Sequence, residues 1–460
     1  MRTSVIVFIS LAFVALSFLN ASDIIWVCST EEQPWQRKEV SLIPESDNGL
    51  PVTFSLKPNH TYQTIDGFGG SFNELGWVAL QEAKSGDLEE VLEALFGEKG
   101  CAFTLARIPI GASDFALDGY SLDDVEEDYD LKHFSIERDR LHLLPYIRAA
   151  MEIRPDLQCW ASPWSPPAWM KVNNSFSRGS LRWEPRVLNT YANYFARWIM
   201  DFRSEGIHLY AVSPQNEPNI LNVYPTCKWT GEQLLEFIAG YLAPTLRKEG
   251  VDIELWLGLN GDPFNDGENV NARLLTVMEN PEAYDLIAGI GFQYDSLNQI
   301  PTAHELYPDK KLMQSESMCF NSDNSWEQSQ ELYRLMRRYL EGGANAYFAW
   351  NMVLDETGKS SWDWPQNSLI SVDSKSGEVT YNGEFYVYKH FSHYVKPGAK
   401  RIMILGPWGD KIAFQNPDGS VVMIIANDSE SIQEVSFGMG GGFKAQLSAN
   451  SINTFVLSKD

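Results

Sequence analysis

The chain has 460 residues, of which 44% are hydrophobic, and its 36 Lys and Arg against 61 Asp and Glu give a formal net charge of −25. The hydrophobic content excludes a disordered chain, and the length fits one large α/β barrel plus a smaller module. So acidic a surface repels phosphate backbones and anionic headgroups, which argues against nucleic-acid binding and peripheral membrane binding.

The first 22 residues have the pattern of an export signal. One Arg precedes an apolar run from Val5 to Leu19, and small and polar residues follow it. Such a run is too short to span a bilayer and suits a signal peptide. We expect cleavage near Ala21 or Ser22, a secreted or periplasmic protein, and no membrane insertion of the mature chain. An uncleaved anchor is the alternative.

Two strand-like runs, "IIWVCST" and "VTFSLK", occupy the next segment, residues 23–60. A second all-strand segment covers residues 396–460. There five runs, among them "SVVMIIAND" and "INTFVLS", are joined by short turns without a helix. This pattern predicts a small antiparallel β-sandwich, and we expect the strands of 23–60 to join it, so that both chain ends build one module.

Between them, residues 61–395 alternate apolar runs with amphipathic helical patterns. Three of the helical patterns end at Gly97, Gly206 and Gly250, which is a helix stop signal. Eight continuous apolar runs predict a (β/α)8 TIM barrel, because its strands are buried on both faces. An open doubly wound sheet is the rival, but no G-x-G-x-x-G turn follows the first run. The runs are 64–72, 103–110, 157–164, 208–218, 253–260, 287–295, 311–317 and 345–352.

Cysteine and histidine give little support for disulfides or metal. The five cysteines are an odd number scattered over the chain, and we expect Cys101 and Cys159 to be buried thiols within apolar runs. The seven His show no metal-ligand spacing, so we expect no metal site.

Barrel enzymes place their active site at the C-terminal ends of the strands, so the residues there are the candidates. The fourth run ends in Asn216 and Glu217, and the seventh ends in Glu316. Fourth and seventh strands lie three steps apart around an eight-strand ring, so their ends can face each other. The other runs contribute Arg107 and Asp114 (second), Trp164 and Trp169 (third), Gln293 and Tyr294 (sixth), and Trp350 and Asn351 (eighth).

Two carboxylates with aromatic rings and amides suit glycoside hydrolysis. The acetal needs a proton on its leaving oxygen and electron density at its anomeric carbon. Carboxyl groups about 5 Å apart give retention of configuration, and about 6.5–9.5 Å gives inversion. Structural readings compete: a strand-end Glu is often a surface residue, Asn216 could cap a turn, and a Trp is often core. Trp164 and Trp169, set among prolines and serines, are expected to be more exposed than core tryptophans.

Four motifs in this order and spacing, "IDGFGGSF", "ASPWSPPAWMK", "AVSPQNEPN" and "QSES", resemble glycoside hydrolase family 30, the family of glucosylceramidases and β-1,6-glucanases. The resemblance covers about Trp26 to the C-terminus. It implies a retaining enzyme with a (β/α)8 barrel, a sandwich built from both chain ends, and no cofactor.

The resemblance also assigns roles to residues. It implies that Glu217 is the acid/base and Glu316 the nucleophile, and that Asn216 holds the sugar 2-hydroxyl. Arg107 matches an arginine near the nucleophile. The first sugar subsite and its surroundings are matched by Asp114, Trp164, Trp350 and Asn351, with Asn367 in "WPQNS" as a further candidate.

The chain departs from the family at the sixth strand, where glucosylceramidases usually carry a His-Trp-Tyr type sequence. Here "GFQYDS" places Gln293 at the His position and leaves Tyr294 to hydrogen-bond the nucleophile. We therefore expect a secreted retaining β-glycosidase acting on β-linked glucose in an oligo- or polysaccharide, with β-1,6-glucan preferred. Glucosylceramidase, β-xylosidase or xylanase, and β-fucosidase are alternatives within the family. A carbohydrate-binding protein without turnover is the alternative from another class.

Overall fold

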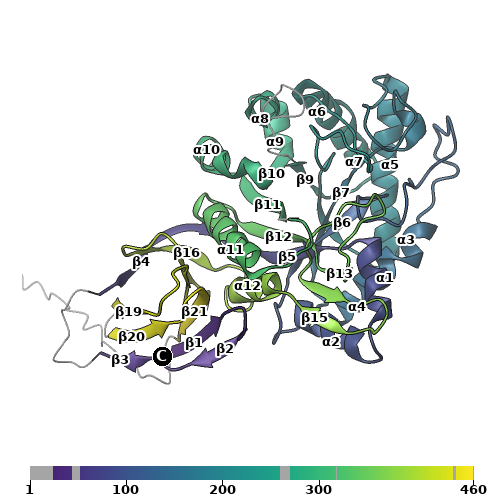
Figure 1. Cartoon of the computed structure of the whole chain (residues 1–460). Helices are drawn as coiled ribbons and strands as arrows, with labels where there is room; N and C mark the ends of the chain where they lie inside the picture. Colours follow the sequence, from purple (N-terminus) through teal and green to yellow (C-terminus); the bar gives the residue numbers. More distant parts are fainter. Residues whose placement is uncertain (1–23, 44–51, 259–269, 318, 439–441, 459–460) are drawn as a thin grey trace, which may run out of the picture.

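The computed structural model describes residues 24–43, 52–258, 270–317, 319–438 and 442–458. The expected export signal, residues 1–22, lies outside these ranges. Within them, no helix is both long enough and apolar enough to cross a membrane. Figure 1 shows two parts, a barrel ringed by helices and a smaller strand module at its lower left.

Eight parallel strands close the barrel, and each lies within one of the eight predicted runs. The predicted (β/α)8 barrel is therefore confirmed. Around the ring the order is β10-β11-β12-β5-β6-β7-β8-β9. The strands are β5 (Gly67–Ser71), β6 (Leu105–Ile110), β7 (Gln158–Pro163), β8 (Leu209–Val212), β9 (Glu254–Gly258), β10 (Ile287–Gln293), β11 (Lys311–Ser317) and β12 (Ala346–Asn351).

Helices cover the outside of the barrel (Figure 1). The stop signals at Gly97, Gly206 and Gly250 each follow a helix directly or after one further residue. The helices are α1 (Glu74–Glu82), α2 (Asp87–Phe96), α3 (Glu137–Leu141), α4 (Leu143–Ile153), α5 (Pro185–Ser204), α6 (Gly231–Phe237), α7 (Ala243–Lys248), α8 (Val270–Met278), α9 (Pro281–Leu286), α10 (Ile300–Leu306), α11 (Trp326–Glu341) and α12 (Gly383–Ser392).

The amphipathic stretch from Gly231 to Gly250 forms two helices rather than one. A π-helical turn, Ile238–Leu242, separates α6 from α7. Pro244 follows this turn, and its ring has no N–H and would clash with the carbonyl four residues earlier. Widening the preceding turn relieves that conflict.

Both ends of the chain build the β-sandwich module, as expected. β1 (Ile24–Ser29) pairs antiparallel with β21 (Ser451–Leu457), and β4 (Phe54–Thr64) pairs antiparallel with β16 (Lys400–Leu405). The sequence did not predict β16, nor the short parallel contact of β4 with β19 (Gln433–Gly438). The remaining strands of this sheet are β2 (Gln36–Lys38), β3 (Ser41–Leu42), β17 (Lys411–Gln415), β18 (Val421–Asn427) and β20 (Gly442–Leu447).

A third, small sheet follows the last barrel strand. It consists of β13 (Val353–Asp355), β14 (Ile370–Val372) and β15 (Val379–Tyr381). The sequence did not predict it, because strands of three residues are too short to show a period. The segment between β13 and β14 is thereby fixed at both ends beside the C-terminal end of β12.

Candidate active site

Apolar side chains fill the inside of the barrel below the C-terminal ends of its strands, and we call this group the plug. The plug consists of Leu105, Trp160, Ala211, Trp256, Met313, Ala346 and Phe348. Side chains two positions apart on a strand share a face, so the next inward positions carry Arg107 on β6, Ser162 on β7 and Trp350 on β12. On β11 the pairing register shifts between Gln314 and Ser317, and Glu316 turns toward the same space.

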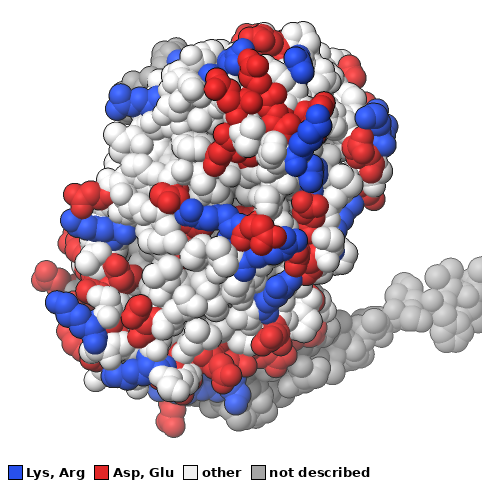
Figure 2. All heavy atoms as spheres, turned by 90° about the vertical axis from the view of Figure 1, so that its right-hand side faces the viewer, with Lys and Arg blue, Asp and Glu red and all other residues white. Residues whose placement is uncertain are grey.

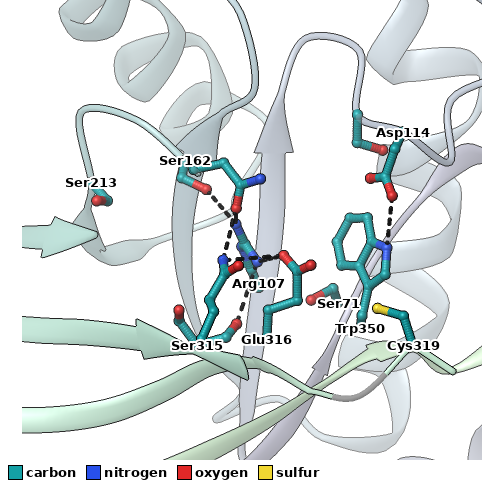
Figure 3. A network of polar contacts seen from close by, with 12 residues as sticks. Ser71, Arg107, Asp114, Ser162, Ser213, Ser315, Glu316, Cys319 and Trp350 are labelled. Atoms are coloured by element: carbon teal, nitrogen blue, oxygen red, sulfur yellow. Dashed lines mark hydrogen bonds and ion pairs between the residues drawn. The ribbon is translucent and has the colours of Figure 1, made fainter. Parts of the chain in front are cut away.

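Glu316 is held by three donors from three elements, and Figure 3 shows its contact with Arg107. Arg107 donates from Nη1 to Oε2 at 2.5 Å, and Gln293 donates from Nε2 to the same oxygen at 3.3 Å. The Tyr294 hydroxyl donates to Oε1 at 2.9 Å. Glu316 as a residue is 4% exposed, so these contacts fix its carboxylate in place with little solvent around it. Charge-assisted hydrogen bonds of this kind stabilise an ionised carboxylate.

Arg107 connects β11, through Glu316, with the loop after β8, through Asn216. Its Nη2 donates to the Ser162 hydroxyl at 2.9 Å and to Oδ1 of Asn216. Its guanidinium lies over three indole rings, 4.9 Å from that of Trp160, 4.4 Å from that of Trp164 and 5.5 Å from that of Trp350. The cation is fully buried, and its charge is balanced by Glu316 and the π faces.

Glu217 lies in a different electrostatic environment. It is 7% exposed, and its pKa is raised well above its ordinary value, first by burial and then by the negative charges of Glu316 and Asp114. Arg107 and a hydrogen bond with Tyr224 oppose this rise only in part. A carboxyl group with a raised pKa thus lies close to one that is ion-paired, an arrangement that can supply a proton donor and an ionised carboxylate in one site.

The amides of Asn216 and Gln293 form a hydrogen-bonded pair beside Glu316. Nε2 of Gln293 donates to Oδ1 of Asn216 at 2.9 Å as well as to Glu316, so the acceptor oxygen of Asn216 is occupied twice, here and by Arg107. Neither of these contacts uses the Asn216 amide nitrogen, which is the donor of this side chain. Oε1 of Gln293 is buried and has no hydrogen-bond partner among the described residues.

Asp114, Trp164 and Trp350 form one wall of the site at the mouth of the barrel, and we call Trp164 and Trp350 the mouth tryptophans. Trp350 donates from Nε1 to Oδ2 of Asp114 at 3.3 Å, and its ring stacks on Trp164 with centroids 5.0 Å apart. Burial and the charge of Glu316 raise the pKa of Asp114. Its Oδ1 is buried without a partner in the described part of the chain. A hydroxyl-bearing ligand can satisfy that oxygen.

The expected exposure of Trp164 and Trp169 was wrong. Trp164 is 1% exposed, because Arg107 covers one side of it and Trp350 stacks on it. Trp169 is 4% exposed and belongs to the main hydrophobic core. Its Nε1 donates to the carbonyl of Asp123. Prolines and serines around a Trp thus do not indicate exposure here.

Two predicted site residues are not brought into this cluster. Asn351 follows Trp350 on β12 and points to the opposite face, where it bonds Asn73 at 3.0 Å and Gln366 at 2.7 Å. Asn367 donates from Nδ2 to Gln328 at 2.7 Å and to Glu384 of α12 at 2.6 Å. These contacts make both residues supports of the loop after β12.

Sequence reasoning missed two neighbours of the glutamates. Tyr224 hydrogen-bonds Glu217 from the loop after β8, and the thiol of Cys319 lies 2.6 Å from the Tyr294 hydroxyl. Both follow a catalytic candidate closely in the chain, so an aromatic or sulfur residue just after a strand-end Glu is the signal that could have found them. All five cysteines are buried and free, as expected for Cys101 and Cys159. Within the described ranges, no group of three or more His, Cys, Asp or Glu could hold a metal ion.

The chain matches two family models. Residues 65–395 match the glycosyl hydrolase family 30 TIM-barrel domain, and residues 398–455 match the family 30 β-sandwich domain. A relative named putative glucosylceramidase 3, from Caenorhabditis elegans, is 28% identical over 77% of this chain and 71% of its own. An endo-1,6-β-D-glucanase of Neurospora crassa is 24% identical over 90% of this chain and 89% of its own.

The fold matches a solved enzyme structure. The endo-β1,6-glucanase BT3312 superposes with a TM-score of 0.85 at 26% identity, over 95% of this chain and 99% of that one. The resemblance to the family rests on both domains and on most of the chain. The protein is therefore a member of glycosyl hydrolase family 30 and a glycoside hydrolase.

Proposed function

We propose that this protein is a secreted retaining β-glycosidase that acts through Glu217 as acid/base and Glu316 as nucleophile. One observation supports this division most directly. Glu316 accepts hydrogen bonds from Arg107, Gln293 and Tyr294, whereas the pKa of Glu217 is raised by burial and by neighbouring negative charge. An ionised nucleophile and a protonated acid are the starting state for retention.

The reaction proceeds in two displacements. Glu316 attacks the anomeric carbon while Glu217 gives its proton to the departing oxygen, which leaves a covalent glycosyl-enzyme. With Glu316 esterified, the negative charge that raised the pKa of Glu217 is gone, and the ionised Glu217 can remove a proton from water. Attack of that water frees the sugar with its original configuration.

The substrate class is a β-linked glucan, with β-1,6-glucan preferred. Relatives from Neurospora crassa and Trichoderma harzianum are named as endo-1,6-β-glucanases and cover 90% of this chain. In the bound state, Oδ1 of Asp114 and Nδ2 of Asn216 hydrogen-bond sugar hydroxyls, and Trp164 and Trp350 form the wall beside the ring.

Glucosylceramide is the second candidate. Relatives from Caenorhabditis elegans and Mus musculus named as glucosylceramidases are 26–28% identical to this chain. Gln293 is the residue that weighs against this candidate, since it stands where glucosylceramidases of the family usually carry His. Its buried Nε2 and Oε1 change the hydrogen bonds offered to the sugar.

Product analysis tests the proposal. The enzyme is incubated with β-1,6-glucan, laminarin, xylan and glucosylceramide, and the anomer released is followed by NMR at early times. We expect the β-anomer from β-1,6-glucan first, and turnover lower by several orders of magnitude in Glu316→Gln. Release of the α-anomer would exclude the double displacement, and preferred release of xylose or ceramide would exclude the substrate class.

A further inference from the structure

The segment between β13 and β14 presents a tryptophan to solvent at the mouth of the barrel. Trp364 is 41% exposed, while the mouth tryptophans Trp164 and Trp350 are 1% and 0% exposed. Single exposed apolar residues are common and need no explanation by themselves. The position of Trp364 relative to the catalytic groups is what makes it informative.

One residue links Trp364 to Glu217. The Tyr224 side chain hydrogen-bonds Glu217, and its ring lies 6.1 Å from the Trp364 ring at an interplanar angle of 83°. Tyr224 itself is 8% exposed, so Trp364 is the outer member of this series and Glu217 the inner one. The indole therefore borders the mouth on the side of the proposed acid.

The side of the mouth next to Glu217 is where the leaving group of a substrate is expected to lie. The acid must reach the oxygen of the bond that breaks, so the leaving part of the substrate passes beside Glu217. The sugar that is attacked lies deeper, because Asp114, Trp164 and Glu316 are each at most 5% exposed. The leaving part of a bound glycan therefore lies beside Tyr224 and Trp364.

The turn that carries Trp364 is tightly hydrogen-bonded. Ser360 donates its N–H to the Trp364 carbonyl at 2.9 Å, and its hydroxyl accepts the Trp364 N–H at 3.2 Å. Lys359 pairs with Asp363 at 2.6 Å and forms a backbone bridge with Pro365. These contacts order the backbone of the turn, so less of it has to be ordered when a ligand binds.

We propose that Trp364 is the platform on which the leaving-group sugar of a β-linked glucan stacks, a statement that rests on the proposed function and extends it. A pyranose has apolar C–H faces and a rim of hydroxyls, and it matches an indole flanked by polar groups. Asp363, which precedes Trp364 in the chain, pairs with Lys359, and Asn222 hydrogen-bonds Tyr224 on the loop that contacts the Trp364 ring. An apolar leaving group is the competing occupant, since Leu221 and Val223 on that loop are 40% and 49% exposed.

Kinetics on three substrates tests this assignment. The substrates are a glucan oligosaccharide that the wild type cleaves, octyl β-glucoside, and β-glucosyl fluoride, whose leaving group is a single atom. We expect Trp364→Ala to lower kcat/KM for the oligosaccharide about tenfold more than for the fluoride. Trp364→Phe should retain most of the wild-type kcat/KM for the oligosaccharide. Tyr62→Ala is the control, because Tyr62 is 37% exposed on β4 of the sandwich.

Each other outcome is decisive. An equal loss on the oligosaccharide and the fluoride would overturn the platform, as would no loss, and a larger loss on octyl β-glucoside would assign the surface to an apolar leaving group. Failure of the wild type to cleave β-glucosyl fluoride would instead count against the proposed function. Calorimetry of oligosaccharide binding to Glu316→Gln, with and without Trp364→Ala, tests the platform separately from the proposed function, because it needs no turnover. Absence of binding to Glu316→Gln, or equal binding to both proteins, would refute the platform.

Discussion

At the mouth of the barrel, Arg107, Glu217 and Glu316 are at most 7% exposed, while at the junction of barrel and sandwich His390 of α12 is equally hidden. Arg107 and Glu316 form an ion pair, and the negative charge of Glu316 helps to raise the pKa of Glu217. His390 instead lies between two neutral hydroxyls, Thr454 and Ser29, each 2.8 Å from one ring nitrogen. Burial, with Lys389 adding to it, lowers its pKa to about 3. Equal burial thus yields reactive charge where charged partners converge and a neutral structural contact where they do not.

Charge also distinguishes the surface from these interiors. Figure 2 shows Asp and Glu gathered over the upper part of one face, among fewer Lys and Arg. Exposed charges of this kind are screened by water and contribute little to stability. Substitutions in the two buried sites are therefore expected to have larger effects, on turnover at the mouth and on stability around His390.

The largest effect is expected from removing Glu316, the proposed nucleophile. Glu316→Ala should lower turnover of an aryl β-glucoside by several orders of magnitude, because no covalent intermediate can form. Azide should restore part of it by filling the vacated space, with a product of inverted configuration. Glu217→Ala with azide should instead give a product of retained configuration, since azide then attacks the glycosyl-enzyme. NMR of the two azide products checks the assignment, and exchanged configurations would reverse it.

The next effect concerns the proton on Glu217. If Glu217 is the proposed acid, its raised pKa favours the protonated form, and kcat/KM should fall as pH rises through that pKa. Glu217→Gln should lower kcat/KM about 10²–10⁴-fold for substrates with poor leaving groups and far less for a dinitrophenyl glucoside, which needs no proton. Rates across a series of phenol leaving groups check this. An equal loss along the series would show that Glu217 is not the acid.

A smaller effect is expected from the departure at the sixth strand. The Gln293 amide donates to both Asn216 and Glu316, whereas a neutral imidazole has one N–H and can serve only one of them. Gln293→His should therefore lower kcat/KM by about tenfold, the cost of one lost hydrogen bond to a charged group. Below about pH 6.5 the ring should gain a second proton and a new pH dependence. A profile that matches the wild type would show that the amide does not bridge these groups.

The sequence was enough to predict the barrel, because barrel strands are continuous apolar runs, and to place Glu316 at the end of one of its strands and Glu217 in the loop after another. Their catalytic roles stay a prediction. The sequence was not enough to predict the direction in which a side chain points. Asn351 turns away from the site because it directly follows the inward Trp350, a matter of register. Tyr224 reaches Glu217 because its loop is bound to a neighbouring one, as the bond from Thr226 N–H to the Phe176 carbonyl shows. Such contacts between loops leave no period in the chain.

The smallest change in activity, and a large one in stability, is expected at His390. His390→Ala should lower the free energy of unfolding by about 2–4 kcal/mol, because it leaves a cavity and two buried hydroxyls without their partner. Turnover of an aryl β-glucoside by the folded protein should stay at the wild-type value, since the ring touches no residue of the mouth.

The pH dependence separates this role from a catalytic one. The folded pKa of His390, about 3, lies below the ordinary 6.5, so the unfolded chain binds the proton more readily. The wild type should lose this contribution as pH falls from about 6.5 toward 3, by up to about 1.4 kcal/mol per pH unit. Denaturant unfolding from pH 7 to 4 checks it, with the alanine variant showing the shallower decline. Parallel declines would mean that His390 is charged in the fold, and the contrast with the mouth would then disappear.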